Sequence, residues 1–435
     1  MKKKINKVIY FFIALNTGLL AQSVLTIDDA IKLGLEKNYS VLISKNEQSI
    51  SKLQNNFGSA GMSPTVSVNA NLNLANVNSY QEFSSGVIQE RNGAQSNNTG
   101  ASINVGWVVF DGLKMFAIKK RLSQNEQLSV IELKQQMENT VYDIITAYYM
   151  VVKTTALINA AKQNLNIYEE RKKIAKLKYS IGSDSKVDVL LSQSNENKAQ
   201  SAIIQLEVQL LNAKTKLNFL LNKPVDEEFS TTDSITVNFN PNIDELKKNI
   251  VKSNSSVLIS KQNELMIEQS IKEARAANLP FVQLNGAYNF TRSQSQAGIV
   301  FLNKQAGLNA GVTAGWLLFS GTKNNKLLKE RNILYLNQKY ISEQVYQQID
   351  GQVYNSYKTY QLNKSIIELE KQNLEDSKEV LMISIERYKL GKANLLETIE
   401  TQKNLEDAQV RYIEALYSMK LAETDLLRAN GSLVK

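Results

Sequence analysis

Two kinds of periodicity alternate along the chain, and they exchange at one short motif that occurs twice. The motif reads GWVVFDG at residues 106–112 and GWLLFSG at residues 315–321. Each copy ends a run in which apolar and polar residues alternate, and each begins a long run with apolar residues three to four apart. Period two is typical of a strand and period 3.6 of a helix. We interpret the motif as the point where a membrane-embedded strand ends and a helix in water begins.

The alternating runs predict four strands, at residues 64–76, 101–110, 280–291 and 308–319. In the first run, the apolar positions from Val66 to Leu74 alternate with serine and asparagine. A soluble half-buried strand would also alternate, but this run is longer than the usual strand. Its polar face is uncharged amide and hydroxyl, which suits a barrel wall with lipid outside and water inside. We expect the segment from 77 to 100, rich in Asn, Ser, Gln and Gly, to be a solvent loop.

Both tryptophans of the chain, Trp107 and Trp316, lie at the two junctions. One tryptophan at the end of a strand could belong to the core of a soluble sheet. Two tryptophans at matching positions favour an aromatic belt at a lipid–water boundary. We therefore predict that both side chains are membrane-interface aromatics.

The runs that follow the junctions predict very long helices. Proline breaks helix interiors, and only four prolines occur, none of them within 112–222 or 321–435. A helix from Gly112 to Tyr179 would reach about 100 Å, and a second helix from Lys186 to Leu221 would return. Further helices are expected from the capping sequence at Thr26 to about Gly58 and from Asn242 onward. A small strand is expected at 234–239.

The chain repeats itself. The sequences NYSVLISK at 38–45 and NSSVLISK at 254–261 agree at seven of eight positions with an offset of 216, and the two junction motifs are 209 residues apart. We therefore divide the chain into a first structural repeat at 22–224, a connecting segment at 225–241 and a second structural repeat at 242–435.

Residues 1–21 have the features of a secretory signal peptide, with lysines followed by an apolar core. A single membrane-anchor helix is the alternative, but the core is too short to span a bilayer comfortably, so we expect cleavage. The formal charge of +9 then falls to about +5, because four lysines lie in this segment (9 − 4). That modest charge gives no reason to expect nucleic acid as a partner.

Four strands cannot close a barrel, and an open sheet edge in hydrocarbon leaves backbone groups without partners. Several copies of the chain must then share one barrel. Two copies would give eight strands and three would give twelve, and the pattern alone is compatible with both numbers. The helices would form a collar continuous with the barrel, and the polar inner faces imply a water-filled duct.

The composition argues against enzyme chemistry. The chain has no Cys and no His, which excludes disulfides, Cys/His metal sites and triads that use either residue. Phosphate-binding and dinucleotide-binding loops and the serine elbow are also missing. We expect no catalytic residue, no metal and no cofactor.

The paired halves, the junction motifs and the turns Tyr179-Ser-Ile-Gly182 and Tyr388-Lys-Leu-Gly391 resemble the TolC family of outer-membrane efflux channels, the outer membrane factors. The resemblance extends over roughly residues 25 to 432. It implies a homotrimer in which a long α-helical barrel, closed at its tip, continues a transmembrane β-barrel of twelve strands, four from each chain. It also implies location in the outer membrane of a Gram-negative bacterium, with an extension into the periplasm.

The resemblance further implies a passive exit duct of a tripartite efflux pump or a type I secretion system. Its partners would be outer-membrane lipid, a periplasmic adaptor (membrane fusion) protein and an inner-membrane RND or ABC transporter. The turns at Gly182 and Gly391 would dock the adaptor, although their glycines could equally be ordinary turn formers.

Matching the turn motifs places the periplasmic aperture at Glu397, Glu400, Asp188 and Tyr388. The two glutamates would line the closed tip, Asp188 is the internal counterpart of Glu397, and Tyr388 would help to latch the closed state. The best-known members of the family carry a latch arginine two positions after the second glycine. Here that position is Ala393, and Lys392 beside it could substitute only weakly.

The residues support this assignment independently of the family. Residues i and i+3 share a helix face, so Glu397 and Glu400 copied around a symmetry axis would form a negative ring, as in cation-selective constrictions. Crowding would raise the pKa of these carboxylates. The alternative is an ordinary solvated helix face, because charged helix faces are common.

Two other functions compete with a conduit. A trimeric coiled-coil structural protein or adhesin with an outer-membrane anchor would need sustained heptads and one set of anchors, whereas this chain has two strand pairs and irregular periodicity. The second competing function is an enzyme, against which the missing catalytic groups argue.

Overall fold

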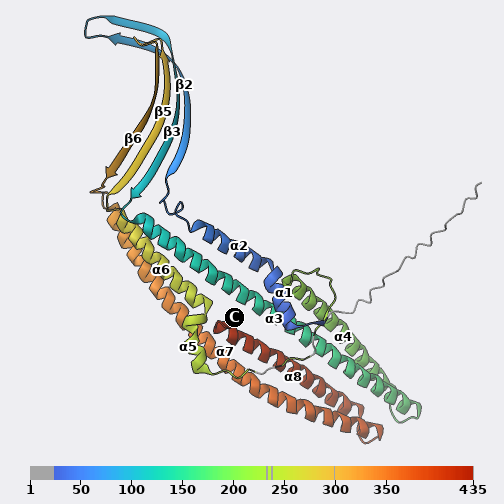
Figure 1. The fold of residues 1–435 in the computed structure, drawn as a ribbon. Helices are drawn as coiled ribbons and strands as arrows, with labels where there is room; N and C mark the ends of the chain where they lie inside the picture. Colours follow the sequence, from blue (N-terminus) through green and yellow to red (C-terminus); the bar gives the residue numbers. More distant parts are fainter. Residues whose placement is uncertain (1–23, 232–233, 237–238, 298, 435) are drawn as a thin grey trace, which may run out of the picture. The chain divides into compact units, whose positions relative to one another are not determined.

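The computed structural model describes residues 24–231, 234–236, 239–297 and 299–434 (Figure 1). The predicted signal peptide lies outside the described residues. The fold is mostly helical with some strands, as predicted. In chain order the elements are β1 (Val24–Leu25), α1 (Ile27–Lys37), α2 (Tyr39–Gln54), β2 (Thr65–Glu82), β3 (Ile88–Phe110), α3 (Lys114–Ser180), α4 (Lys186–Leu220), β4 (Ser230–Thr231), α5 (Ile243–Ser253), α6 (Ser255–Ala276), β5 (Phe281–Ser295), β6 (Leu302–Gly315), α7 (Lys323–Lys389) and α8 (Leu395–Ala429).

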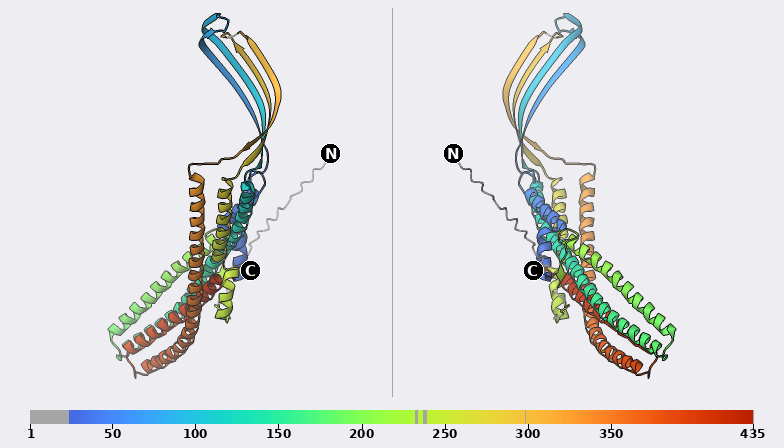
Figure 2. Two further views of the ribbon diagram at one scale, coloured as in Figure 1. Left: turned by 90° about the vertical axis from the view of Figure 1, so that its left-hand side faces the viewer. Right: turned by 90° about the vertical axis from the view of Figure 1, so that its right-hand side faces the viewer.

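The long strands form one antiparallel sheet in the order β2-β3-β5-β6, and its curvature is clear in both views of Figure 2. One row of the sheet runs from Val68 through Ile103 and Tyr288 to Leu308. All four of these side chains are exposed. The apolar face of the sheet is therefore bare in a single chain, and the opposite face carries asparagine, serine and glutamine.

The prediction that residues 77–100 form a solvent loop is wrong. β2 continues to Glu82, β3 starts at Ile88, and only residues 83–87 form the turn between them. Amide and hydroxyl side chains are frequent in loops. Here, however, the backbones of β2 and β3 pair with each other, so these side chains lie on the faces of a two-stranded ribbon. The last strand also differs from the prediction of 308–319. β6 ends at Gly315, so Trp316 follows the strand.

Two asparagines at matching positions of the repeat divide helices that the periodicity predicts to be continuous. Asn38 separates α1 from α2, and Asn254 separates α5 from α6. Each asparagine donates its side-chain amide to a carbonyl at the end of a distant helix. Asn38 Nδ2 is 2.9 Å from the oxygen of Leu220, and Asn254 Nδ2 is 2.8 Å from that of Ala429. These carbonyls lack partners within their own helices, so the breaks in α1–α2 and α5–α6 cap the ends of α4 and α8.

The helices that follow the junction motifs confirm the long helical prediction. α3 and α7 have 67 residues each, and the returning helices α4 and α8 have 35 each. The starts of α1 and α5 are capped as expected, by the side chains of Thr26 and Asn242.

A second, very small sheet pairs β1 with β4 in parallel. β4 occupies residues 230–231, whereas the sequence predicts a strand at 234–239. The described residues of 234–239 do not form a strand. The hydroxyl of Tyr148 donates to the carbonyl of Leu25, at 2.9 Å. A Cβ atom at position 34 would lie 2.1 Å from a methyl group of Ile144, so a larger residue than Gly34 would force that side chain to shift.

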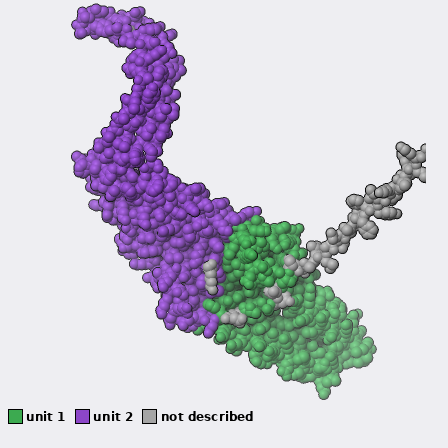
Figure 3. Space-filling model, viewed as in Figure 1, with its two compact units in different colours: residues 1–38, 140–239, 360–424 green, residues 39–139, 240–359, 425–435 purple. Residues whose placement is uncertain are grey.

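The chain forms two compact units, coloured separately in Figure 3. Unit 1 contains the described residues up to Asn38 together with 140–239 and 360–424, and unit 2 contains 39–139, 240–359 and 425–434. Each unit therefore takes segments from both sequence repeats. The turns that connect α3 to α4 and α7 to α8 belong to unit 1, and the four-stranded sheet belongs to unit 2.

Candidate functional site

The two turns of unit 1 are built in the same way. Gly182 and Gly391 have φ values of +77° and +71°, a conformation in which side chains other than glycine are strained. The amide of each glycine donates to the carbonyl of the tyrosine three residues earlier, Tyr179 or Tyr388, at 3.1 Å. A Cβ atom would meet nothing within 4 Å at either glycine. The Y-x-x-G spacing therefore specifies a helix C-cap with a left-handed glycine.

The helices after the turns start with matching caps. Ser185 and Asp188 form a capping box at the start of α4, in which the Asp188 carboxylate accepts from the Ser185 amide at 3.1 Å. At the start of α8, the side chain of Asn394 accepts from the amide of Glu397 at 2.8 Å. Asp188 and Glu397 are thus third residues of their helices, where a negative charge is favoured by the helix dipole. A capping role is sufficient to explain Asp188.

Tyr388 joins the two turns. Its hydroxyl donates to Asp184 Oδ2 at 2.7 Å, and its ring is 1% exposed. The ammonium of Lys178 lies 3.6 Å from Asp184 Oδ1 and 4.1 Å from the centre of the tyrosine ring. Burial raises the pKa of Tyr388, and the hydrogen bond to Asp184 raises it further. The phenol therefore stays protonated and remains a hydrogen-bond donor.

The first repeat does not copy this contact. Tyr179, the counterpart of Tyr388, is 48% exposed, and Ala393 occupies the position that matches Asp184. The tip of unit 1 therefore has one buried tyrosine–carboxylate pair instead of two, and one tyrosine facing solvent.

Glu397 and Glu400 lie on one side of α8 but have different surroundings. Glu397 Oε1 is 3.2 Å from Arg387 Nη1, and the same guanidinium lies 3.4 Å from the carbonyl oxygen of Lys392. Glu400 is exposed and has no ion pair within the described part of the chain. The cation next to the carboxylates predicted for the aperture is thus Arg387, which is not among the residues predicted from the sequence. Its position matches Lys178, so the repeat alignment contained the signal.

A buried arginine supports α8 directly behind these carboxylates. Arg171 is 2% exposed, and its Nη1 donates to the side chain of Gln402 at 2.7 Å and to the carbonyl of Thr398 at 3.3 Å. Its guanidinium carbon lies 4.8 Å from the centre of the Tyr168 ring. Burial raises the pKa of Glu406 nearby. No local pattern indicates this cluster, since it depends on the packing of α3 against α8.

The two tryptophans are held in the same way in unit 2. Trp107 Nε1 donates to the carbonyl of Met62 at 2.8 Å, and Trp316 Nε1 donates to that of Asn278 at 3.0 Å. Met62 and Asn278 precede the first strand of each strand pair, at the offset of the repeat. The rings themselves are 42% and 61% exposed. A polar edge bonded to backbone and an exposed apolar ring fit the interface position predicted for both residues.

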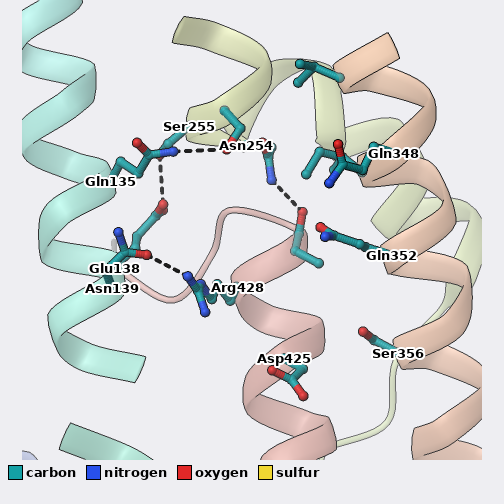
Figure 4. A pocket seen from close by; sticks show the side chains of 14 residues that line it. Gln135, Glu138, Asn139, Asn254, Ser255, Gln348, Gln352, Ser356, Asp425 and Arg428 are labelled. Atoms are coloured by element: carbon teal, nitrogen blue, oxygen red, sulfur yellow. Dashed lines mark hydrogen bonds between the residues drawn. The ribbon is translucent and has the colours of Figure 1, made fainter. Parts of the chain in front are cut away.

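A polar cavity of about 540 Å³ lies in unit 2, lined by residues of α3, α6, α7 and α8 (Figure 4). Glu138 is 4% exposed there, and its carboxylate accepts from the Ser255 hydroxyl at 2.7 Å. Arg428 donates to the side chain of Asn139 at 2.7 Å. Burial is the main reason that the pKa of Glu138 is raised. These contacts connect α3 to α6 and α8 and give the cavity a structural role.

The described residues contain no cluster of three or more acidic side chains that could hold a metal ion. One helix in this part of the chain, α3, is long and apolar enough to cross a membrane by length and composition. Half of its most apolar stretch is buried inside the protein, as in a core helix.

Known proteins share the family and the fold of this chain. The family model for "Outer membrane efflux protein" matches residues 38–223 and 249–432. No curated protein sequence matches the chain. Among solved structures, the CmeC outer membrane channel of Campylobacter jejuni has a TM-score of 0.80 at 14% identity, covering 99% of this chain and 94% of its own.

Two further structures have similar values. VceC of Vibrio cholerae has a TM-score of 0.76 at 14% identity, covering 93% of this chain and 96% of its own. The open-state MtrE outer membrane channel of Neisseria gonorrhoeae has a TM-score of 0.74 at 17% identity, with 94% and 89% covered. At these identities the likeness concerns the fold.

Proposed function

Because the chain belongs to the outer membrane efflux protein family, we propose that three copies of it form one duct through which a tripartite efflux pump or a type I secretion system exports its substrate. Membership confirms the resemblance found in the sequence and gives the protein as an outer-membrane efflux channel with a periplasmic extension. The family consists of channel proteins rather than enzymes.

The observation that carries the proposal is the pair of free edges in the four-stranded sheet. β2 and β6 each have one paired side within the described chain. In hydrocarbon, the unpaired backbone groups of such edges cost several kcal/mol each. Pairing β6 of one copy with β2 of the next removes both edges when the ring closes.

The inner face of the sheet supports three copies over two. An eight-stranded barrel is about wide enough for its own side chains to fill the interior. The polar face of this sheet carries short amides and hydroxyls, including Asn69, Asn104 and Asn285, which suit contact with water. Twelve strands would leave a lumen for that water and for a passing substrate.

The paired turns of unit 1 suit an adaptor protein. Ile181 and Leu390 directly precede the two turn glycines and are 71% and 70% exposed. Val187 and Leu396, also at matching positions, are 61% and 66% exposed. Apolar side chains repeated at exposed turns are typical of a protein contact. We assign these turns, with Gly182 and Gly391, to a periplasmic adaptor that links the duct to an RND or ABC transporter of the inner membrane.

The same tip would act as the gate. Tyr388 and Asp184 hold the two helical hairpins of one chain together, and Glu400 supplies a negative charge that threefold symmetry would repeat around the axis. Glu397 adds less to this ring than the sequence suggests, because Arg387 neutralises part of its charge.

Conductance in planar lipid bilayers tests the proposal. The purified protein should produce cation-selective channels, since water-filled lumens conduct and negative rings favour cations. A trimeric adhesin with a membrane anchor would produce no channels under the same conditions. A protein that inserts and remains silent at all voltages would refute the duct.

A further inference from the structure

A groove lies on unit 2 where helix α6 ends and helix α3 begins, next to the strands (Figure 1). Its volume is about 390 Å³, which is within the range of small-molecule sites. Gly112 lets the two helix ends meet, because a Cβ atom there would lie 2.6 Å from a backbone oxygen at the end of α6. The residues that line the groove include three apolar and two basic ones, Leu113, Phe116, Leu279, Lys272 and Arg275.

The groove opens on the same side as the apolar face of the sheet. A separate cavity lies on the other side of the two helices and is lined by Phe281 and Lys114. Phe281 is three residues from Leu284, which pairs with Trp107 on the apolar face, so Phe281 lies on the polar face. Phe116 is two residues after Lys114 and thus about 200° around α3. The groove that contains Phe116 therefore faces lipid, and the second cavity faces the polar side.

The groove stays open in a closed ring of any number of copies. α3 follows β3 and α6 precedes β5, and these two strands pair with each other in the middle of the sheet. Copies joined at the free edges, β2 and β6, meet elsewhere. In an outer-membrane protein with a periplasmic extension, the strand ends next to the helices lie at the leaflet that faces the periplasm. The headgroups of that leaflet are then the neighbours of the groove.

The apolar side chains of the groove are exposed without being needed for the turn. Leu113, Phe116 and Leu279 are 56%, 57% and 46% exposed. In the second repeat, Thr322 has the same left-handed backbone as Leu113, with φ values of +67° and +70°. Asn325 corresponds to Phe116 in the same way. Because polar residues build the same junction, the apolar surface of the first repeat indicates an apolar neighbour.

The groove also has more positive than negative charge. Lys272 lies 3.1 Å from Glu268 Oε1 in an exposed ion pair, which is weak. The Arg275 side chain has no hydrogen-bond or ion-pair partner within the described part of the chain. Lys120, one turn after Phe116, adds a third positive charge on that face of α3. The dipole of α6 favours a cation at the position of Arg275 but does not explain the apolar side chains beside it.

We propose that this groove binds an anionic phospholipid of the leaflet that faces the periplasm. The phosphate lies between Lys272 and Arg275, and one acyl chain lies along Leu113 and Phe116 and continues into the hydrocarbon. Each basic side chain next to an anionic leaflet contributes about fivefold in affinity. The inference rests on the outer-membrane location and is independent of the number of copies.

Native mass spectrometry of the purified protein in detergent tests the site, with phosphatidylglycerol or phosphatidylcholine of the same acyl chains added in turn. The protein should retain one phosphatidylglycerol per chain at concentrations at which it retains little phosphatidylcholine. K272Q/R275Q should weaken phosphatidylglycerol binding about twentyfold, from two contributions of about fivefold. K323Q/K326Q is the matched control, since it removes two exposed lysines from the corresponding junction at the start of α7. Equal losses in both variants would assign the binding to net charge and refute the groove.

The acyl chain is tested separately. Phe116→Asn introduces the residue of the second repeat and should weaken phosphatidylglycerol binding, whereas soluble glycerol phosphate should not displace the lipid. If Phe116→Asn binds the lipid as tightly as the parent protein, or if glycerol phosphate displaces the lipid at equal concentration, the site recognises phosphate alone and the lipid assignment fails. All the substituted side chains are exposed, so circular dichroism should give the same spectrum for every variant.

Discussion

The hydroxyl of Tyr388 donates a 2.7 Å hydrogen bond to the carboxylate of Asp184, and this bond joins the turn of the second repeat to the turn of the first. The matching positions, Tyr179 and Ala393, cannot form the reciprocal bond. In an otherwise duplicated tip, this hydrogen bond between the two turns is thus made once in each chain, by one buried phenol.

If the tip of unit 1 is the gate proposed above, removing that bond should loosen its closed state. A hydrogen bond to a charged group contributes about 1.5–3 kcal/mol, so Tyr388→Phe should shift the balance toward the open state about tenfold or more. Single-channel recordings would show a larger open fraction. Tyr179→Phe is the matched control and should leave it unchanged. Equal open fractions in all three proteins would mean that Tyr388 has no part in gating.

Glu397 and Glu400, the two glutamates proposed to line the aperture, should differ in their effect on selectivity. Glu400→Gln should lower cation selectivity more than Glu397→Gln, because Arg387 lies 3.2 Å from the Glu397 carboxylate. Arg387→Gln should raise cation selectivity by releasing that charge. Reversal potentials in a potassium chloride gradient measure all three variants, and the double variant E397Q/E400Q should also weaken block by divalent cations. If the currents of the double variant were unchanged, neither glutamate would line the aperture.

Glu138 should make the stability depend on pH. Its pKa is raised, mainly by burial, so its contribution to the free energy of unfolding is complete below the ordinary pKa of a glutamate. The contribution is lost as the pH rises through the folded-state pKa, because the unfolded chain ionises first. Each unit by which the folded-state pKa exceeds the unfolded-state pKa corresponds to about 1.4 kcal/mol in the free energy of unfolding. Chemical unfolding in detergent, followed by circular dichroism, should therefore show stability falling as the pH rises above the ordinary pKa of a glutamate.

The variant that tests this dependence is Glu138→Gln, which keeps an acceptor for Ser255 and cannot ionise. Its stability should change less with pH than that of the parent protein over the same range. An identical slope in both proteins would assign the pH dependence to other groups.

The tryptophans allow a direct test of membrane depth. The chain has two, so Trp107→Phe and Trp316→Phe each leave one reporter. In vesicles containing brominated lipids, both reporters should be quenched most strongly by bromines near the headgroups, as expected for aromatic belts. Fluorescence that no lipid quencher reaches would place the rings in a protein core.

Most of the architecture is readable from the sequence because it follows from periodicity. The strand–helix junctions, the returning helices and the duplication all depend on which positions are apolar. The strand pairing of residues 77–82 with 88–94 could not be predicted, because the Asn, Ser and Gln residues of this segment are as common in loops and the pairing is made by backbone groups. Asn38 and Asn254 were also missed as helix breaks, because each acts through a carbonyl about 180 residues away.

The candidate site was predicted less completely. Motif matching located the turns and their carboxylates, but it could not identify the partners, which depend on how two hairpins pack. Arg387 was overlooked beside the absent arginine at Ala393, and Arg171 has no sequence signal at all. Burial and pairing therefore decide how charge is distributed around the tip.

The number of chains in the purified, detergent-solubilised particle is the decisive quantity for a barrel shared between copies. The free edges of β2 and β6 require more than one chain per particle, and the polar inner face of the sheet predicts three. Native mass spectrometry measures this number, with the sheet content checked by circular dichroism. A stable monomer with its sheet intact would contradict the shared barrel, because its two strand edges would then persist without a partner.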